Sequence, residues 1–154
     1  MKQTMKKYVI DTSAIIEKIP SVKIKEKKIT EGEIIIPHAV VAELESQANR
    51  GKEIGLIGLD EIQEIRDLCN KKLTLTFLGE RPSEHQIRHA KSVEIDAYIR
   101  EIATENEAIL ITADLVQAKS GKALGLEVDY ISIVKFQEEL SLGKYLDDKT
   151  MSLH

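Results

Sequence analysis

The stretch YVIDTS, residues 8–13, places three strand-forming residues directly before Asp11 and two hydroxyl residues, Thr12 and Ser13, directly after it. A strand that ends in a carboxylate brings that carboxylate to the carboxyl edge of a sheet. In open α/β folds, this is the edge at which binding sites are built. We therefore expect an α/β fold in which Asp11 is the first member of a polar site.

The rest of the chain alternates between short apolar runs and helical patterns. Strands are predicted at residues 7–10, 33–36, 73–77, 108–111 and 126–131. Helices are predicted at residues 12–19, 22–29, 37–49, 59–69, 83–90, 93–104 and 114–123. Continuous apolar strands are typical of a sheet covered on both faces. The pattern predicts a three-layer α/β/α sandwich around a mostly parallel five-stranded sheet.

Proline and glycine punctuate this pattern. Pro20 is expected to end the first helix, and Gly51, Gly55 and Gly58 are expected to form a loop or hinge. After Ile131 the chain turns polar, which predicts a helix at residues 135–142 and a linker at 143–154. Residues 1–131 are thus expected to form one domain, and residues 132–154 a helix with a linker.

Composition narrows the possible functions. The chain has 154 residues, of which 42% are hydrophobic and 31% charged, as in an ordinary globular domain. A net charge of −4 and 4% aromatic residues argue mildly against a nucleic-acid binder that stacks bases on an aromatic surface. The single cysteine, Cys69, excludes an internal disulfide and fits a reducing, cytoplasmic setting. No apolar run approaches the roughly 20 residues that span a bilayer, so no membrane association is expected.

Three acids join Asp11 in comparable positions. Asp114 follows the strand at 108–111, at the same sheet edge as Asp11. Glu43 lies in the first turns of the helix after the second strand, and Asp96 interrupts an apolar helical pattern. A carboxylate among isoleucines is unfavourable unless it is paired or binds a metal.

Each acid also has a simpler explanation. Asp11 or Asp114 could cap the helix that it precedes. Asp96 could pair with Arg100 one turn later, and Glu43 could be one solvated acid on an amphipathic helix. These explanations weaken when they are taken together, because four acids would then share one end of one sheet by coincidence.

Four neighbouring carboxylates repel one another, and a divalent cation relieves that repulsion. Oxygen ligands without His or Cys favour Mg²⁺ or Mn²⁺ over zinc. Removing the four charges would take the net charge from −4 to 0, so this site alone could account for the acidity of the chain.

These residues resemble the PIN domain family, a nuclease fold with four acids around a metal site. The resemblance covers residues 7–131 and rests on VIDTS (9–13), VVAEL (40–44), EIDAYI (94–99) and ITAD (111–114). It implies that Asp11, Glu43, Asp96 and Asp114 are catalytic residues and hold one or two Mg²⁺ or Mn²⁺ ions. Thr12, Ser13 and Thr112 are expected to support them.

A narrower resemblance is to the N-terminal PIN domain of archaeal PIN-domain ATPases with an AAA+-like motor. It rests on IIIP (34–37), ELE (43–45), QANRG (47–51) and the tail DKTMSLH (148–154). In that family such a tail leads into an ATPase domain, and the full-length protein is expected to be a homo-oligomer. The implied substrate is single-stranded RNA, or less readily single-stranded DNA.

Basic residues near the site edge could bind phosphates, and the candidates are Lys6, Lys7, Arg81, Arg88 and Lys91. The competing hypothesis is a non-catalytic module that gates nucleic acid, arranges subunits or docks a partner protein. A stand-alone toxin-type ribonuclease is a third, which the ATPase-like tail disfavours.

No function is expected of two other motifs. AKSGKA (118–123) resembles the end of a P-loop but lacks its first glycine and its final Ser or Thr. His85 and His89 lie four residues apart without a third metal ligand, so we expect them to be solvated.

Overall fold

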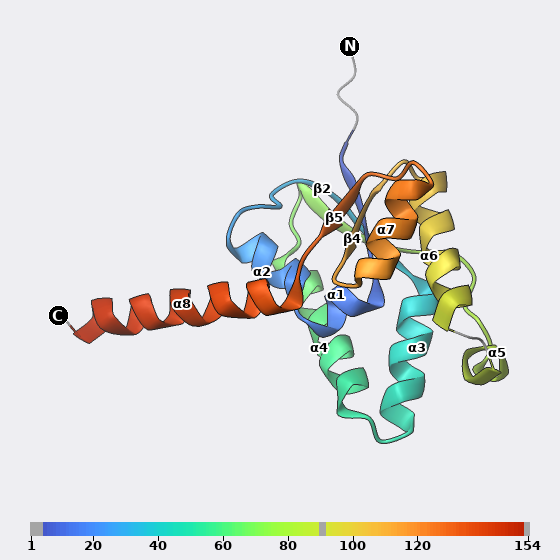
Figure 1. The fold of residues 1–154 in the computed structure, drawn as a ribbon, viewed down its shortest axis with the longest axis horizontal. Helices are drawn as coiled ribbons and strands as arrows, with labels where there is room; N and C mark the ends of the chain where they lie inside the picture. The colour runs from blue at the N-terminus through green and yellow to red at the C-terminus, as the bar shows by residue number, and fades with distance from the viewer. Residues whose placement is uncertain (1–4, 90–91, 153–154) are drawn as a thin grey trace, which may run out of the picture.

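A computed structural model describes residues 5–89 and 92–152. Its centre is a five-stranded, wholly parallel sheet in the order β3-β2-β1-β4-β5 (Figure 1). The strands are β1 (Lys7–Ile10), β2 (Gly32–Pro37), β3 (Leu73–Leu78), β4 (Ile109–Thr112) and β5 (Val128–Tyr130). The predicted fold class and the five strands are confirmed.

Helices cover both faces of this sheet. They are α1 (Thr12–Ile16), α2 (Ile19–Lys25), α3 (His38–Asn49), α4 (Glu53–Leu68), α5 (Glu84–His89), α6 (Ser92–Glu105), α7 (Leu115–Ala123) and α8 (Ile133–Ser152). Helices α1, α2 and α3 contact α4, whereas α6 contacts β1 and β4, and α7 contacts β4 and β5. Because crossovers between parallel strands are right-handed, the direction of strand order sets which face each helix covers. The result is the three-layer sandwich seen in Figure 1.

The central strands β1, β2 and β4 are largely apolar because both faces are covered, whereas β3 and β5 at the edges of the sheet are less buried. Val9, Ile10, Ile35, Leu110 and Ile111 are completely buried. This is the burial that continuous apolar strands predict for a parallel sheet.

The strand order reverses beside β1. The chain proceeds from β1 to β2 on one side, and β4 pairs with the other side of β1. Ile10 lies level with Ile111, and the backbone N–H of Asp11 donates to the carbonyl of Ile111 at 3.0 Å. The carboxyl ends of β1 and β4 are therefore flush, at the point where open α/β sheets bind ligands.

The first helical region differs from the prediction. Helix α1 ends at Ile16, and α2 begins at Ile19 with Pro20 in its first turn. Lys18 makes the break with a φ of 61°. Pro20 therefore opens a helix instead of ending one, because proline has no N–H to leave unpaired in a first turn.

The C-terminal prediction is also partly wrong. The helix expected at residues 135–142 is α8, which runs from Ile133 to Ser152 through most of the expected linker. It projects from the body of the domain in Figure 1. Within residues 5–89 and 92–152, no helix combines the length and apolarity needed to cross a membrane.

Gly55 and Gly58 do not form a hinge. Both lie inside α4, which starts at Glu53 and packs against α3. A Cβ atom on Gly55 would collide with the backbone nitrogen of Ala48 and the carbonyl oxygen of Leu44. On Gly58 the atoms nearest to it all belong to the side chain of Leu44. The glycines thus allow close contact between two helices.

This packing predicts that Gly55→Ala lowers the free energy of unfolding by about 1–3 kcal/mol, because the helix backbones must separate. The expected loss occurs although alanine favours a helix over glycine by roughly 1 kcal/mol. Gly58→Ala should lose less, because a side chain can move aside. Urea denaturation measures these changes. Gly143→Ala is the control, because no atom lies within 4 Å of its added Cβ; an equal loss there would contradict the explanation.

Candidate active site

Asp11 is a buried carboxylate at the end of β1, and it is 2% exposed. Its Oδ2 accepts hydrogen bonds from Ser13 Oγ at 2.8 Å and Thr112 Oγ1 at 2.7 Å. Its Oδ1 is also buried and has no hydrogen-bond partner among the described residues. A buried, unpartnered carboxylate oxygen is unfavourable unless it meets a further ligand.

The two hydroxyl groups hold the ends of β1 and β4 together. Ser13 Oγ accepts from the backbone N–H of Ala113 at 3.0 Å, and Thr112 Oγ1 accepts from that of Asp114 at 3.0 Å. Because each hydroxyl oxygen already accepts a hydrogen bond from a backbone N–H group, its proton is free to donate to Asp11. Thr12 is buried too, and its hydroxyl has no partner in the part of the chain that the structure describes.

Asp114 is the N-cap of α7. Its Oδ1 accepts from the backbone N–H groups of Val116 at 2.8 Å and Gln117 at 3.3 Å. The capping role that the sequence left open is therefore real. It uses Oδ1, which leaves Oδ2 available for another ligand, so capping and metal binding are compatible.

Electrostatic interactions link Asp11, Glu43, Asp96 and Asp114. Burial raises the pKa of Asp96 to about 6, with further contributions from the charges of Asp11, Asp114 and Glu43. Burial also raises the pKa of Glu43, the nearby Thr12 hydroxyl opposes the rise, and the charge of Asp11 adds to it. Burial raises the pKa of Asp11, the hydroxyl groups of Thr112 and Ser13 and the nearby amide of Gln117 oppose the rise, and the charge of Asp114 adds to it. These contributions place the four predicted acids within electrostatic range of one another.

The residue types at this place fit a divalent cation. Four carboxylates and no His or Cys make a set of hard oxygen ligands, and Asp11 Oδ1 is a buried oxygen that lacks a partner. However, within the described ranges no three His, Cys, Asp or Glu residues already form a metal-holding group. Metal binding by the four acids therefore remains a prediction, and it requires their side chains to draw together.

Sequence reasoning missed Gln117. Arg100, which could have paired with Asp96, instead donates through Nη1 to Gln117 Oε1 at 2.6 Å. Gln117 Nε2 donates in turn to the main-chain carbonyl of Asp96 at 3.0 Å. Gln117 lies one turn beyond the helix cap and is 1% exposed. Its burial becomes evident only in the folded structure, so the sequence pattern alone gave no signal for it.

The predicted phosphate-binding residues are scattered. Lys6 and Lys7 lie at the start of β1, at the opposite end of the strand from Asp11, beside a pocket that Glu105 and Glu107 also line. This placement argues against their role at the site.

Of the other three predicted phosphate-binding residues, two form ion pairs with acids. Arg81 makes a bidentate contact with Glu45, with both distances 3.1 Å, and Arg88 pairs with Glu84 at 3.2 Å. Lys91 lies outside the described residues. Arg50, which was not predicted, is exposed at the end of α3, and its charge lowers the pKa of Glu43.

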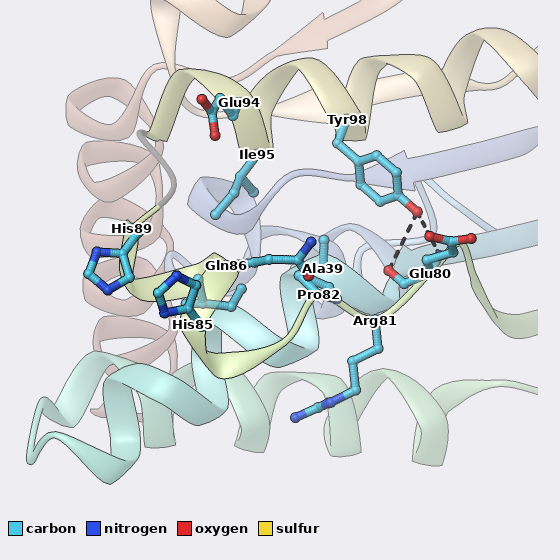
Figure 2. A pocket seen from close by; sticks show the side chains of 11 residues that line it. Ala39, Glu80, Arg81, Pro82, His85, Gln86, His89, Glu94, Ile95 and Tyr98 are labelled. Atoms are coloured by element: carbon cyan, nitrogen blue, oxygen red, sulfur yellow. Dashed lines mark hydrogen bonds between the residues drawn. The ribbon is translucent and has the colours of Figure 1, made fainter.

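A pocket of about 430 Å³ lies at the same edge of the sheet, beyond the ends of β2 and β3. Ala39, one turn before Glu43, and Ile95, directly before Asp96, are among its lining residues. Figure 2 shows His85 and His89 on one side of the pocket and Tyr98, bonded to the backbone of Glu80, on the other. The pocket therefore adjoins the acids through the two helices that carry Glu43 and Asp96.

Comparison with known proteins identifies a family. The family described as "PIN domain" matches residues 8–122. A KH and PIN-domain containing protein of Methanocaldococcus jannaschii is 41% identical over 150 residues, which are 97% of this chain and 23% of that protein. The Holliday junction branch migration ATPase PINA of Sulfolobus acidocaldarius is 24% identical over 144 residues, which are 94% of this chain and 26% of that protein. The chain thus spans about a quarter of the length of both relatives.

A solved structure confirms the fold. It is a domain of a functionally unknown protein from Methanocaldococcus jannaschii, with a TM-score of 0.79 and 40% sequence identity. The match covers 82% of this chain and 91% of that chain.

The raised pKa of Asp96 predicts a pH-dependent stability. The unfolded chain should have an ordinary aspartate pKa of about 4, and the folded chain has one of about 6. The stabilisation from this group is therefore fully present below pH 4 and is lost as the pH rises through 6. In a metal chelator, Asp96→Asn should become more stable relative to wild type between pH 4 and pH 7, as measured by melting temperature. Asp60→Asn, at an exposed position on α4, is the control; parallel curves for Asp96→Asn and wild type would contradict the prediction.

Proposed function

Because the chain belongs to the PIN domain family, whose members are generally nucleases, we propose that it is a Mg²⁺- or Mn²⁺-dependent endoribonuclease domain that cleaves single-stranded RNA. The proposal rests on Asp11, which is buried with one carboxylate oxygen unpartnered. It also rests on the electrostatic interactions that connect Asp11 with the other three acids. The network around Oδ2 joins the ends of β1 and β4, but the unpartnered oxygen and the mutual repulsion of the acids raise the free energy of the folded state, and a bound cation would account for them.

The proposed roles follow from the free oxygens. Asp11 through Oδ1, Asp114 through Oδ2, and the carboxylate of Asp96 would hold the cation, while Glu43 would either hold it or orient a water. Ser13 and Thr112 fix the orientation of Asp11 through its other oxygen. When bound, the cation would lower the pKa of a water for attack on phosphorus and offset the charge that builds on the phosphate oxygens.

Electrostatics also link the cation to substrate binding. Four carboxylates repel a phosphate, so the scissile group can approach only when positive charge is present. Arg50 is an exposed basic residue close enough to act on Glu43, and it is our candidate for a neighbouring phosphate. The choice of RNA over DNA rests on the family resemblance.

The relatives suggest a larger setting. One is named as a branch migration ATPase, and this chain matches only 26% of it. We propose that this domain likewise works within a longer, oligomeric PIN-domain ATPase.

The alternative is a non-catalytic module of such an ATPase, which gates nucleic acid or docks a partner. Two observations favour it. The four acids are not already arranged as a metal site in the described part of the chain. The printed name of one relative refers to moving a DNA junction.

Metal binding is tested by thermal melting with and without Mn²⁺. Binding only to the folded state should stabilise it by about 2.7 kcal/mol at a hundredfold excess over the dissociation constant. Asp11→Asn should remove that gain and should raise metal-free stability, because one repelling charge is lost. Asp60→Asn should respond as wild type does. An unchanged melting temperature of the wild type in Mn²⁺ would refute the metal site.

Cleavage is tested with end-labelled single-stranded RNA in Mn²⁺, beside single-stranded DNA of the same sequence. We expect wild type and Asp60→Asn to cut RNA and Asp96→Asn to lose more than about a hundredfold in rate, since loss of mere supporting residues already costs 10–100-fold. Equal cleavage by wild type and Asp96→Asn would indicate a contaminant. Metal binding without cleavage would favour the non-catalytic module.

A further inference from the structure

Gln117 joins two helices that carry predicted metal ligands. Its side chain, on α7, is buried between that helix and α6. Oε1 accepts from Arg100 Nη1 at 2.6 Å, and Nε2 donates to the main-chain carbonyl of Asp96 at 3.0 Å. The backbone N–H of Gln117 also donates to Asp114 Oδ1 at 3.3 Å. One residue thus contacts both Asp96 and Asp114.

The partners fix the orientation of the amide. A guanidinium group has only donors, so it must meet the amide oxygen, and a main-chain carbonyl is only an acceptor, so it must meet the amide nitrogen. A flipped amide would lose both bonds. The connection therefore has one arrangement, and it sets where the backbone of Asp96 lies relative to the cap of α7.

Stability alone does not explain this connection. A buried polar network that is only partly satisfied carries the cost of each unpaired group, and Arg100 Nε is buried without a partner among the described residues. An apolar side chain between α6 and α7 would fill the same space without leaving a donor unpaired. A role in positioning the neighbouring acids would explain why polar residues occupy this buried position.

We propose that Gln117, held by Arg100, is a positioning residue that sets the spacing of Asp96 and Asp114 for cation binding. The inference rests on the proposed metal-dependent function and specifies what organises its ligands. In the arrangement described, the amide of Gln117 is engaged by Arg100 and by the main chain of Asp96, and its role is to position the ligands. Arg100 acts through Gln117 and also supplies a positive charge near Asp96, which lowers the pKa of that acid.

The test is isothermal titration of the folded, metal-free protein with Mn²⁺. Gln117→Met keeps the length and packing of the side chain but removes both bonds, and its affinity for Mn²⁺ should fall by about tenfold or more. Gln63→Met is the matched control, because Gln63 is an exposed glutamine inside α4. In the RNA assay, excess Mn²⁺ should restore the kcat of Gln117→Met, and KM for RNA should stay near the wild-type value.

A metal-free readout separates positioning from general destabilisation. In amide NMR spectra without metal, Gln117→Met should shift the signals of Asp96 and Asp114, and Gln63→Met should not. If Gln117→Met does not fold, Arg100→Met and Arg100→Lys replace it. Lysine retains a donor for the amide oxygen, so Arg100→Lys should keep more of the affinity than Arg100→Met.

The outcomes are distinguishable. Wild-type Mn²⁺ affinity in Gln117→Met, or equal affinity in the two Arg100 variants, would overturn the positioning role and leave the proposed nuclease intact. A wild-type protein that does not bind Mn²⁺ would overturn the proposed function, and the inference with it.

Discussion

The buried carboxylate of Asp11 is the constraint on which the rest of this domain depends. It lies where β1 and β4 end level with each other, and it is held by hydroxyl groups from both segments, Ser13 and Thr112. Those hydroxyls in turn accept from the backbone at the start of the β4–α7 turn. The charge, the strand register and the turn that presents Asp114 therefore form one connected arrangement.

This arrangement opposes stability in the absence of a cation. Burial and mutual repulsion raise the pKa values of Asp11, Glu43 and Asp96 together. The apolar sheet and the close contact of α3 with α4 offset this repulsion elsewhere in the domain. Proteins commonly concentrate such unfavourable charge at functional sites, and a ligand that removes the repulsion links function to stability. The same logic explains why the polar connection through Gln117 is retained in an interior that an apolar residue could fill.

The sequence predicted those parts of the structure that depend on local chemistry. Apolar runs before Asp11 and after residue 107 correctly predicted buried parallel strands, because burial on both faces requires them. It failed at Pro20, Gly55 and Gly58. Proline can open a helix as well as end one, and a glycine inside a helix cannot be told from a loop glycine until its neighbour is known. It also placed Lys6 and Lys7 at the wrong end of β1, although strand direction alone would have excluded them.

By itself, then, the sequence determined the α/β class, the parallel sheet and the two aspartates, Asp11 and Asp114, that follow β1 and β4 at its carboxyl edge. Hydrophobic periodicity and strand direction are local properties, and they carry this information. Only the tertiary structure decided that Asp11 has one oxygen held and one unpartnered, that Asp114 caps a helix with a single oxygen, and that Arg100 meets Gln117 instead of Asp96. These features depend on contacts between residues that lie as far as 101 positions apart along the chain, such as Asp11 and Thr112, and packing brings them together.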